Sequence, residues 1–239
     1  MAGLQRPAKY YKPIKMFISS KLLRINILLS IFYSFLFSIK GNANAINIDD
    51  LYVMLHDKRP EIRLSAIEEL GKIKNHETVK MLMAVVEDRY EDWKIRGRAI
   101  RLLGEIKDPI ALNLLINVLK DIFLNNDCPA LKWNTVKALG NFKNEKALDA
   151  LIEELNTDSL TVKEATIYSL GEIGHNRALP HLISLLNHKS FAVKRGALIS
   201  IRKIGNPEAI PFLRQLLEKE DDQLLKDIAS ATIQLLSKD

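Results

Sequence analysis

The sequence is poor in the residues that cross-link a fold or hold a metal ion. Its single cysteine, Cys128, cannot form a disulfide within one chain. None of its five histidines shares the His-x-x-x-His spacing of a helical zinc site. Phosphate-binding loops, dinucleotide fingerprints and nucleophile elbows are also missing from the sequence. The sequence therefore predicts a fold stabilised by packing, with no catalytic residue, metal or cofactor.

Acidic residues are missing from the first 45 positions, and this absence changes how the net charge of +6 is interpreted. Seven of the 35 basic residues lie in that segment, which leaves 28 basic against 29 acidic residues over 46–239. A surface that binds nucleic acid needs an uncompensated excess of positive charge. We therefore expect no nucleic-acid partner.

The same N-terminal segment has the three parts of a secretory signal. A basic stretch precedes a mostly apolar run of 15 residues, Ile25–Ile39, and small residues follow at Ala43 and Ala45. A helix that crosses a bilayer needs roughly 20 residues. The pattern predicts a signal peptide over 1–45, cleaved after Ala45, and a periplasmic or secreted protein. Two alternatives stay open: an uncleaved segment that anchors the protein in the inner membrane, and a true start at Met16. Contact with a membrane is expected only through this segment.

The remainder of the chain repeats one pattern, which is marked by the dipeptide Leu-Gly. Successive copies are separated by 33, 36, 31, 31 and 32 residues. The six equivalent positions are Leu70-Gly71, Leu103-Gly104, Leu139-Gly140, Leu170-Gly171, Ile201-Arg202 and Ile233-Gln234. A period of this length is typical of stacked helical repeats.

Each copy predicts a pair of helices. Counting the aliphatic residue eight positions before the marker leucine as position 0, apolar or small residues recur at positions 0, 4, 8 and 11, which lie on one helix face. In the first copy these are Ile62, Ala66, Leu70 and Ile73. A polar turn and a second apolar segment complete the copy. Prolines suited to the first turn of a helix occur at Pro60, Pro129, Pro180 and Pro211.

One such hairpin cannot bury its apolar face alone, so the copies must stack. No segment alternates with period two long enough to indicate a strand. The predicted fold is all-α, an α-solenoid of about six stacked helical hairpins over residues 46–239.

The segments "PEIRLSAIEELGKI", "WKIRGRAIRLLGEIKDPIAL" and "LTVKEATIYSLGEIGHNRALPHLISLL" carry a family resemblance. They resemble HEAT-repeat proteins, of the bacterial subtype called phycobilisome-lyase HEAT-like repeats. The resemblance implies a protein-binding scaffold, although a few members attach bilins, modify amino acids or repair DNA. The metal-dependent hydroxylase of this architecture uses several His-Glu pairs, whereas this chain has one, His76-Glu77.

Position 1 of every copy is basic and would form a ladder along the stack. These residues are Arg63, Arg96, Lys132, Lys163, Lys194 and Lys226. The resemblance implies that they pair with acidic residues of the preceding loop. The acidic residues placed to do so are Asp57, Asp92, Asp127, Asp158 and Asp221.

Positions 2 and 6 of the helix that carries Leu-Gly point away from the predicted core. The resemblance implies that this face lines a concave groove. Position 2 reads Leu64, Gly97, Trp133, Glu164, Arg195 and Asp227, and position 6 reads Glu68, Arg101, Lys137, Tyr168, Ile199 and Ala231. Aromatic residues and arginine are enriched at interaction hot spots. The predicted protein-binding residues are Trp133, Tyr168, Arg101, Lys137 and Arg195.

These observations favour a non-enzymatic scaffold that binds another protein or a peptide through the concave face. The first alternative is a lyase-like protein that handles a bilin or another tetrapyrrole, which visible absorbance of the purified protein would reveal. The second is a membrane-anchored oligomeric envelope scaffold, which would appear at full-length mass in the membrane fraction.

Overall fold

The computed structural model describes residues 47–121 and 129–238, which are helical with short connections. The predicted signal peptide, the residue Cys128 and the ladder partner Asp127 lie outside the described residues. From Ile48 onward the chain forms one compact unit. Its α-helices are α2 (Ile48–Leu55), α3 (Pro60–Ile73), α4 (His76–Glu87), α5 (Trp93–Ile106), α6 (Ile110–Lys120), α8 (Pro129–Gly140), α9 (Glu145–Glu154), α10 (Leu160–Ile173), α11 (Leu179–Ser184), α12 (Phe191–Ile204), α13 (Ile210–Lys219) and α14 (Gln223–Leu236). Short 3-10 helices flank α11 at Asn176–Ala178 and Leu185–Asn187, and another precedes α13 at Pro207–Ala209.

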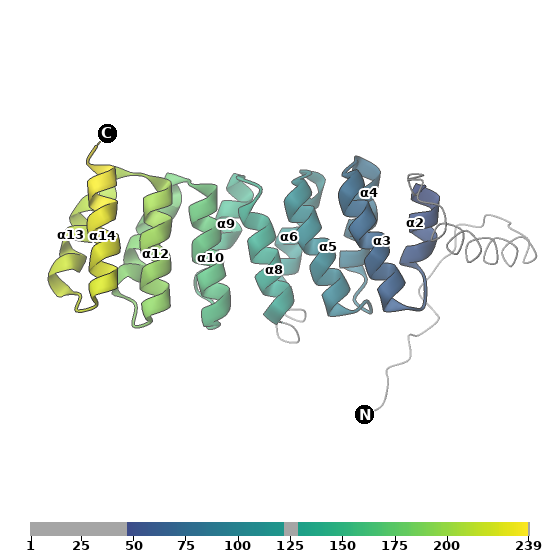
Figure 1. The fold of residues 1–239 in the computed structure, drawn as a ribbon, viewed down its shortest axis with the longest axis horizontal. Helices are drawn as coiled ribbons and strands as arrows, with labels where there is room; N and C mark the ends of the chain where they lie inside the picture. Colours follow the sequence, from purple (N-terminus) through teal and green to yellow (C-terminus); the bar gives the residue numbers. More distant parts are fainter. Residues whose placement is uncertain (1–46, 122–128, 239) are drawn as a thin grey trace, which may run out of the picture. The chain divides into compact units, whose positions relative to one another are not determined.

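The helices stand side by side in chain order (Figure 1). Six of them, α3, α5, α8, α10, α12 and α14, carry the Leu-Gly marker or its equivalent, and each of these packs against the next along the stack. We call them the Leu-Gly helices. The other six form the second layer, and each hairpin contributes one helix to each layer. No strand occurs in residues 47–121 and 129–238. The all-α solenoid of six helical hairpins is therefore confirmed.

The core lies between the two layers and follows the predicted positions. The marker leucines at position 8 (Leu70, Leu103, Leu139 and Leu170) are fully buried. Position 11 fits less well, because Ile73 is 39% exposed at the last residue of α3. Burying one leucine side chain contributes about 1.5–3 kcal/mol, so a column of buried leucines supplies much of the stabilisation.

The polar turns fix where the helices begin. The Asn75 side chain accepts a hydrogen bond from the backbone of Thr78, and the Thr78 hydroxyl lies 3.1 Å from the Asn75 nitrogen, a reciprocal cap at the start of α4. Asn144 caps α9 and Asp222 caps α14 in a simpler way. Pro60 and Pro129 open α3 and α8, where the missing amide donor costs no hydrogen bond.

The marker glycine is required by contact between successive Leu-Gly helices. A Cβ atom on Gly104 would lie 2.6 Å from the Ala138 Cα, and one on Gly140 would lie 2.7 Å from the Ser169 Cβ. Gly171 meets the side chain of Ser200 in the same way. These three glycines thus face a small residue at position 7 of the next copy, whereas Gly71 faces the side chain of Leu102 at the same position. The motif combines a core leucine with a glycine that lets two helix backbones approach.

This close approach distinguishes the two layers. Successive Leu-Gly helices contact each other extensively, whereas successive helices of the second layer contact each other sparsely. The hydroxyl of Ser200 reaches across this tight seam and donates a 2.8 Å hydrogen bond to the carbonyl oxygen of Ile167. Unequal spacing of two layers rotates each repeat relative to the last, with the closely spaced layer on the inner side. The Leu-Gly helices therefore present the inner surface of the stack.

Candidate protein-binding face

The outward side of the Leu-Gly helices, made by positions 2, 6 and 10 of each copy and by Arg202 at position 9 of the fifth copy, is called here the Leu-Gly face. The structure brings the predicted residues together on four successive helices of this face. Arg101 comes from α5, Trp133 and Lys137 from α8, Tyr168 from α10 and Arg195 from α12. Arg101 and Arg195 are exposed and Lys137 is half-buried.

One position predicted to be exposed is buried. Gly97 of α5 is covered because the Asn134 amide of the next Leu-Gly helix lies over it, 2.9 Å from where a Cβ would stand. Asn134 itself is held by a hydrogen bond from its amide nitrogen to the Ala130 carbonyl oxygen. The prediction of an exposed position 2 in this copy was wrong because a neighbouring repeat supplies the cover.

The two aromatic residues lie on neighbouring helices and differ in their surroundings. Trp133 is 37% exposed and Tyr168 is 42% exposed. Lys137 lies with its ammonium 4.1 Å from the centre of the Tyr168 ring, and Lys203 of α12 lies 4.0 Å from the same centre. Both distances are typical of cation–π contacts, which help hold the ring in place.

A carboxylate completes this cluster. Glu172 lies one turn after Tyr168 on α10 and forms an ion pair with Lys203. The pKa of Glu172 lies below its ordinary value, chiefly because Lys203 donates a hydrogen bond to it. Burial lowers the pKa of Lys137, and the Lys203 charge lowers it further, while the charge of Glu172 acts in the opposite direction. Lys203 is thus neutralised by a direct ion pair, whereas Lys137 has only the more distant attraction of Glu172.

Several cations of the Leu-Gly face have no direct carboxylate partner. Within residues 47–121 and 129–238, no carboxylate lies within 4.0 Å of Arg101, Lys137, Arg195 or Arg202. At the N-terminal end of the face, by contrast, Arg98 binds Glu68 in bidentate fashion at 2.5 Å. The central helices α5 to α12 therefore present aromatic rings among cations that have no direct carboxylate partner.

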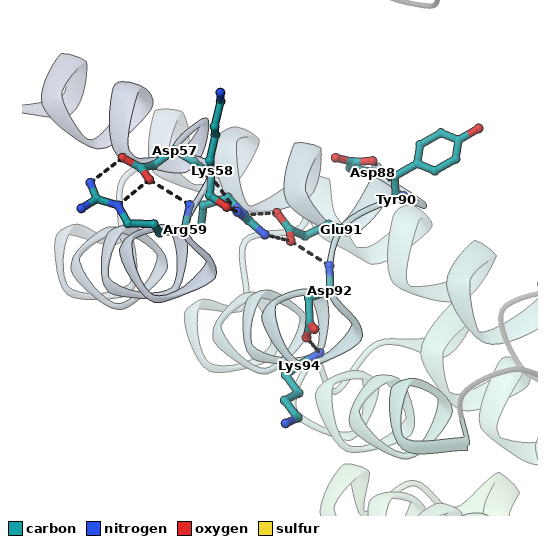
Figure 2. A network of polar contacts seen from close by, with 9 residues as sticks. Asp57, Lys58, Arg59, Asp88, Tyr90, Glu91, Asp92 and Lys94 are labelled. Carbon is teal, nitrogen blue, oxygen red and sulfur yellow. Dashed lines mark hydrogen bonds and ion pairs between the residues drawn. The ribbon is translucent and has the colours of Figure 1, made fainter. Parts of the chain in front are cut away.

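Three of the six basic residues at position 1 form ion pairs in the structure, but their partners differ from those predicted. Arg63 pairs with Glu91 at 2.7 Å, and Figure 2 shows Glu91 at the centre of this network. Lys132 pairs with Glu154 at 2.9 Å, and Lys194 pairs with Glu220.

These three glutamates lie at the end of the next helix along the chain or just after it, in the following hairpin. The prediction of partners in the preceding loop was therefore wrong for these three residues. Asp57 binds Arg59 instead, and Asp92 accepts a hydrogen bond from the backbone of Lys94 (Figure 2). Arg96 donates to the carbonyl oxygen of Val86. The side chains of Arg63, Lys132 and Lys194 thus reach forward along the stack, and each ties its hairpin to the next.

The histidines are dispersed across the described residues. His76 lies 3.2 Å from Asp108, and His175 and His188 accept hydrogen bonds from backbone amides at turns. No group of three or more potential metal ligands occurs within 47–121 and 129–238. Two surface cavities lie away from the Leu-Gly face, one involving α4 and α6 and the other α9 and α11.

Comparison with known families decides how the fold is classified. The family model described as HEAT repeats matches residues 48–122, 116–190 and 148–234, which together cover most of the chain. The chain belongs to the HEAT-repeat family. Its helical hairpins are HEAT repeats. Counted from α2, each hairpin pairs a second-layer helix with the Leu-Gly helix that follows it, whereas the sequence copies were counted from the Leu-Gly helix.

Solved structures agree with this HEAT-repeat fold. The complex of CpcE and CpcF of phycocyanin lyase from Nostoc sp. PCC7120 shares 23% identity with a TM-score of 0.55, over 81% of this chain and 77% of that chain. A designed armadillo repeat protein in complex with peptide (KR)4 shares 19% identity with a TM-score of 0.59, over 80% and 100% of the two chains. Computationally designed armadillo repeat proteins for modular peptide recognition share 20% identity with a TM-score of 0.54, over 79% and 99%. A comparison with curated proteins gave no match.

Proposed function

We propose that this HEAT-repeat protein is an exported, non-enzymatic scaffold that binds another protein or a peptide through the Leu-Gly face. One observation carries the proposal: Trp133 and Tyr168 are partly exposed on neighbouring helices and lie among the cations Arg101, Lys137 and Arg195. Aromatic and arginine side chains of this kind supply most of the binding energy at protein interfaces.

The rigidity of the face supports the proposal. Two lysine ammonium groups contact the Tyr168 ring, and the helices that carry these residues are held together by glycine contacts and buried leucines. A preformed face loses little conformational entropy when a partner binds, so more of the contact energy appears as affinity. Solved structures with this fold include a complex of two protein chains and a repeat protein bound to a peptide.

The proposed export rests on the signal pattern over residues 1–45. Cleavage after Ala45 would release the solenoid into the periplasm or the medium of a bacterium. Within the described residues no helix is both long and apolar enough to span a bilayer. Mass spectrometry of the N-terminus of protein recovered from the native host tests this part of the proposal, and an intact segment 1–45 would contradict it.

Capture from the native host tests the binding function. Protein is cross-linked in envelope extracts, and captured proteins are identified by mass spectrometry for wild type and for the Trp133→Ala, Tyr168→Ala double variant. We expect wild type to capture one protein in stoichiometric amount. The double variant should bind this protein at least about 30-fold more weakly than wild type, because truncating even one hot-spot aromatic residue costs about 2 kcal/mol or more.

A matched control is available on the other layer. Phe212 of α13 is 43% exposed, close to the value for Tyr168, but it lies on the second layer. Phe212→Ala should capture as much partner as wild type, and circular dichroism should show that all three proteins are equally helical. Equal loss of capture in Phe212→Ala and in the double variant would refute binding through the Leu-Gly face.

A further inference from the structure

The charge on the Leu-Gly face indicates the chemistry of the partner. Across α5, α8, α10 and α12 the face presents five cations, of which Lys203 alone has a carboxylate within 4.0 Å in the described residues. The other four are Arg101, Lys137, Arg195 and Arg202. This excess is local, because residues 46–239 as a whole have a net charge of −1.

The second layer pairs some of its cations, namely Arg89 with Asp121, Arg177 with Asp149 and Lys120 with Glu153. Other exposed cations of that layer have no carboxylate within 4.0 Å in the described residues, among them Lys80, Lys146 and Arg214. What sets the central Leu-Gly face apart is that its unpaired cations share one face with the exposed aromatic residues Trp133 and Tyr168. Like charges held near one another raise the free energy of the unbound face, and an incoming anion relieves that repulsion.

We infer that the occupant of this face is an acidic, extended segment of a partner protein, an inference that rests on the proposed function. The carboxylates of the segment pair with Arg101, Lys137 and Arg195, and one of its apolar or aromatic side chains packs on Tyr168. Guanidinium groups bind carboxylates through paired hydrogen bonds. The part of the Tyr168 ring that Lys137 and Lys203 leave uncovered offers the apolar contact between α8 and α12.

The face favours a peptide over nucleic acid. Glu105, Glu164 and Glu172 are interleaved with the cations on the same helices. A phosphate backbone places a negative charge at every nucleotide and would meet these carboxylates. A protein segment can place its carboxylates only opposite the cations, so it fits a face of mixed sign.

Geometry sets the length of a suitable probe. Neighbouring helices in contact lie about 8–10 Å apart, so α5 to α12 span about 30 Å. An extended chain covers about 3.3–3.6 Å per residue, so about 12 residues reach across the four helices with some length to spare. The probe is therefore a fluorescein-labelled peptide of four Glu-Gly-Leu units, and the comparison peptide has four Lys-Gly-Leu units.

Fluorescence anisotropy with the full chain tests the inference. The acidic peptide is expected to bind at least tenfold more tightly than the basic peptide, and its affinity should fall as salt is raised from 50 to 300 mM because exposed charges are screened. The Arg101→Glu, Lys137→Glu, Arg195→Glu variant should lose at least tenfold in affinity. Because Lys137 is half-buried, the Arg101→Glu, Arg195→Glu variant provides a second test at two exposed sites.

The matched control reverses three exposed cations of the second layer, Lys80, Lys146 and Arg214, and so changes the net charge equally. Unchanged affinity in this control, with loss in both face variants, supports the inference. It is overturned if the control weakens binding equally, if the basic peptide binds as tightly, or if a twelve-nucleotide oligouridylate binds more tightly than the acidic peptide. Each of these failures leaves the capture experiment with the aromatic variants intact as a separate test of the proposed function.

Discussion

Replacing Arg63 by methionine is expected to lower the free energy of unfolding of the N-terminal hairpins by about 3–5 kcal/mol, because it leaves a buried carboxylate without its cation. The side chains of Arg63 and Glu91 are only 8% and 6% exposed and are joined by two hydrogen bonds of 2.7 Å. Arg63 also donates to the carbonyl oxygens of Asp57 and Lys58. Methionine keeps the apolar stem and removes all of these donors.

Because each repeat contacts only its neighbours, the loss should appear locally. Hydrogen exchange of the amides in α3 and in α4 should accelerate, while exchange in α12 should stay close to wild type. Arg59→Met is the control, since Arg59 forms an exposed ion pair with Asp57 in the same loop, and its removal should leave exchange nearly unchanged. If the amides of α3 exchange equally slowly in Arg63→Met and Arg59→Met, the Arg63–Glu91 pair does not hold the first hairpin to the second.

Adding a single methyl group at Gly104 is expected to destabilise the solenoid by about 2 kcal/mol, although alanine is the better helix former. The new Cβ would lie 2.6 Å from the Ala138 Cα, and backbone cannot move aside as a side-chain end can. Overpacking of this kind costs about 1–3 kcal/mol. Moreover, separating α5 from α8 weakens the contacts along the whole seam between them.

The same substitution at Gly196 is expected to have the opposite sign. Gly196 also lies within a Leu-Gly helix, but the nearest atom to an added Cβ is the Ile167 Cγ2 at 3.3 Å, a methyl group that needs to move by only a few tenths of an ångström. Alanine at a helix interior is favoured over glycine by about 1 kcal/mol. Urea unfolding of the two variants measures the difference. Equal stabilisation by both substitutions would mean that the marker glycine is not required by helix contact.

The sequence was sufficient to predict features that repeat within one hairpin. The spacing of Leu70, Leu103, Leu139 and Leu170 predicted both the helices and the buried column, because periodicity within a helix reports which side faces the core. The four prolines stand in first turns as predicted. The five predicted binding residues lie on the outward side of consecutive Leu-Gly helices, which follows from the same periodicity.

Features that depend on how one hairpin packs against the next could not be predicted from the sequence. The direction in which Arg63 leans is set by the offset between repeats, so its partner Glu91 could not be chosen over Asp57 from spacing alone. The cover over Gly97 comes from Asn134, 37 positions further along the chain. Lys203 and Glu172 beside Tyr168 were missed for the same reason, although both stand at position 10, one turn beyond the positions that were read.

Site-specific photo-cross-linking tests the central claim most directly, since it reports which face touches the partner. The photoreactive residue p-benzoylphenylalanine is placed at Tyr168 in one protein and at Phe212 in another, two sites of nearly equal exposure on opposite layers. Binding through the Leu-Gly face predicts a cross-link from position 168 to the captured protein, within an acidic segment, and none from position 212. A cross-link from position 212 without one from position 168 would contradict the account.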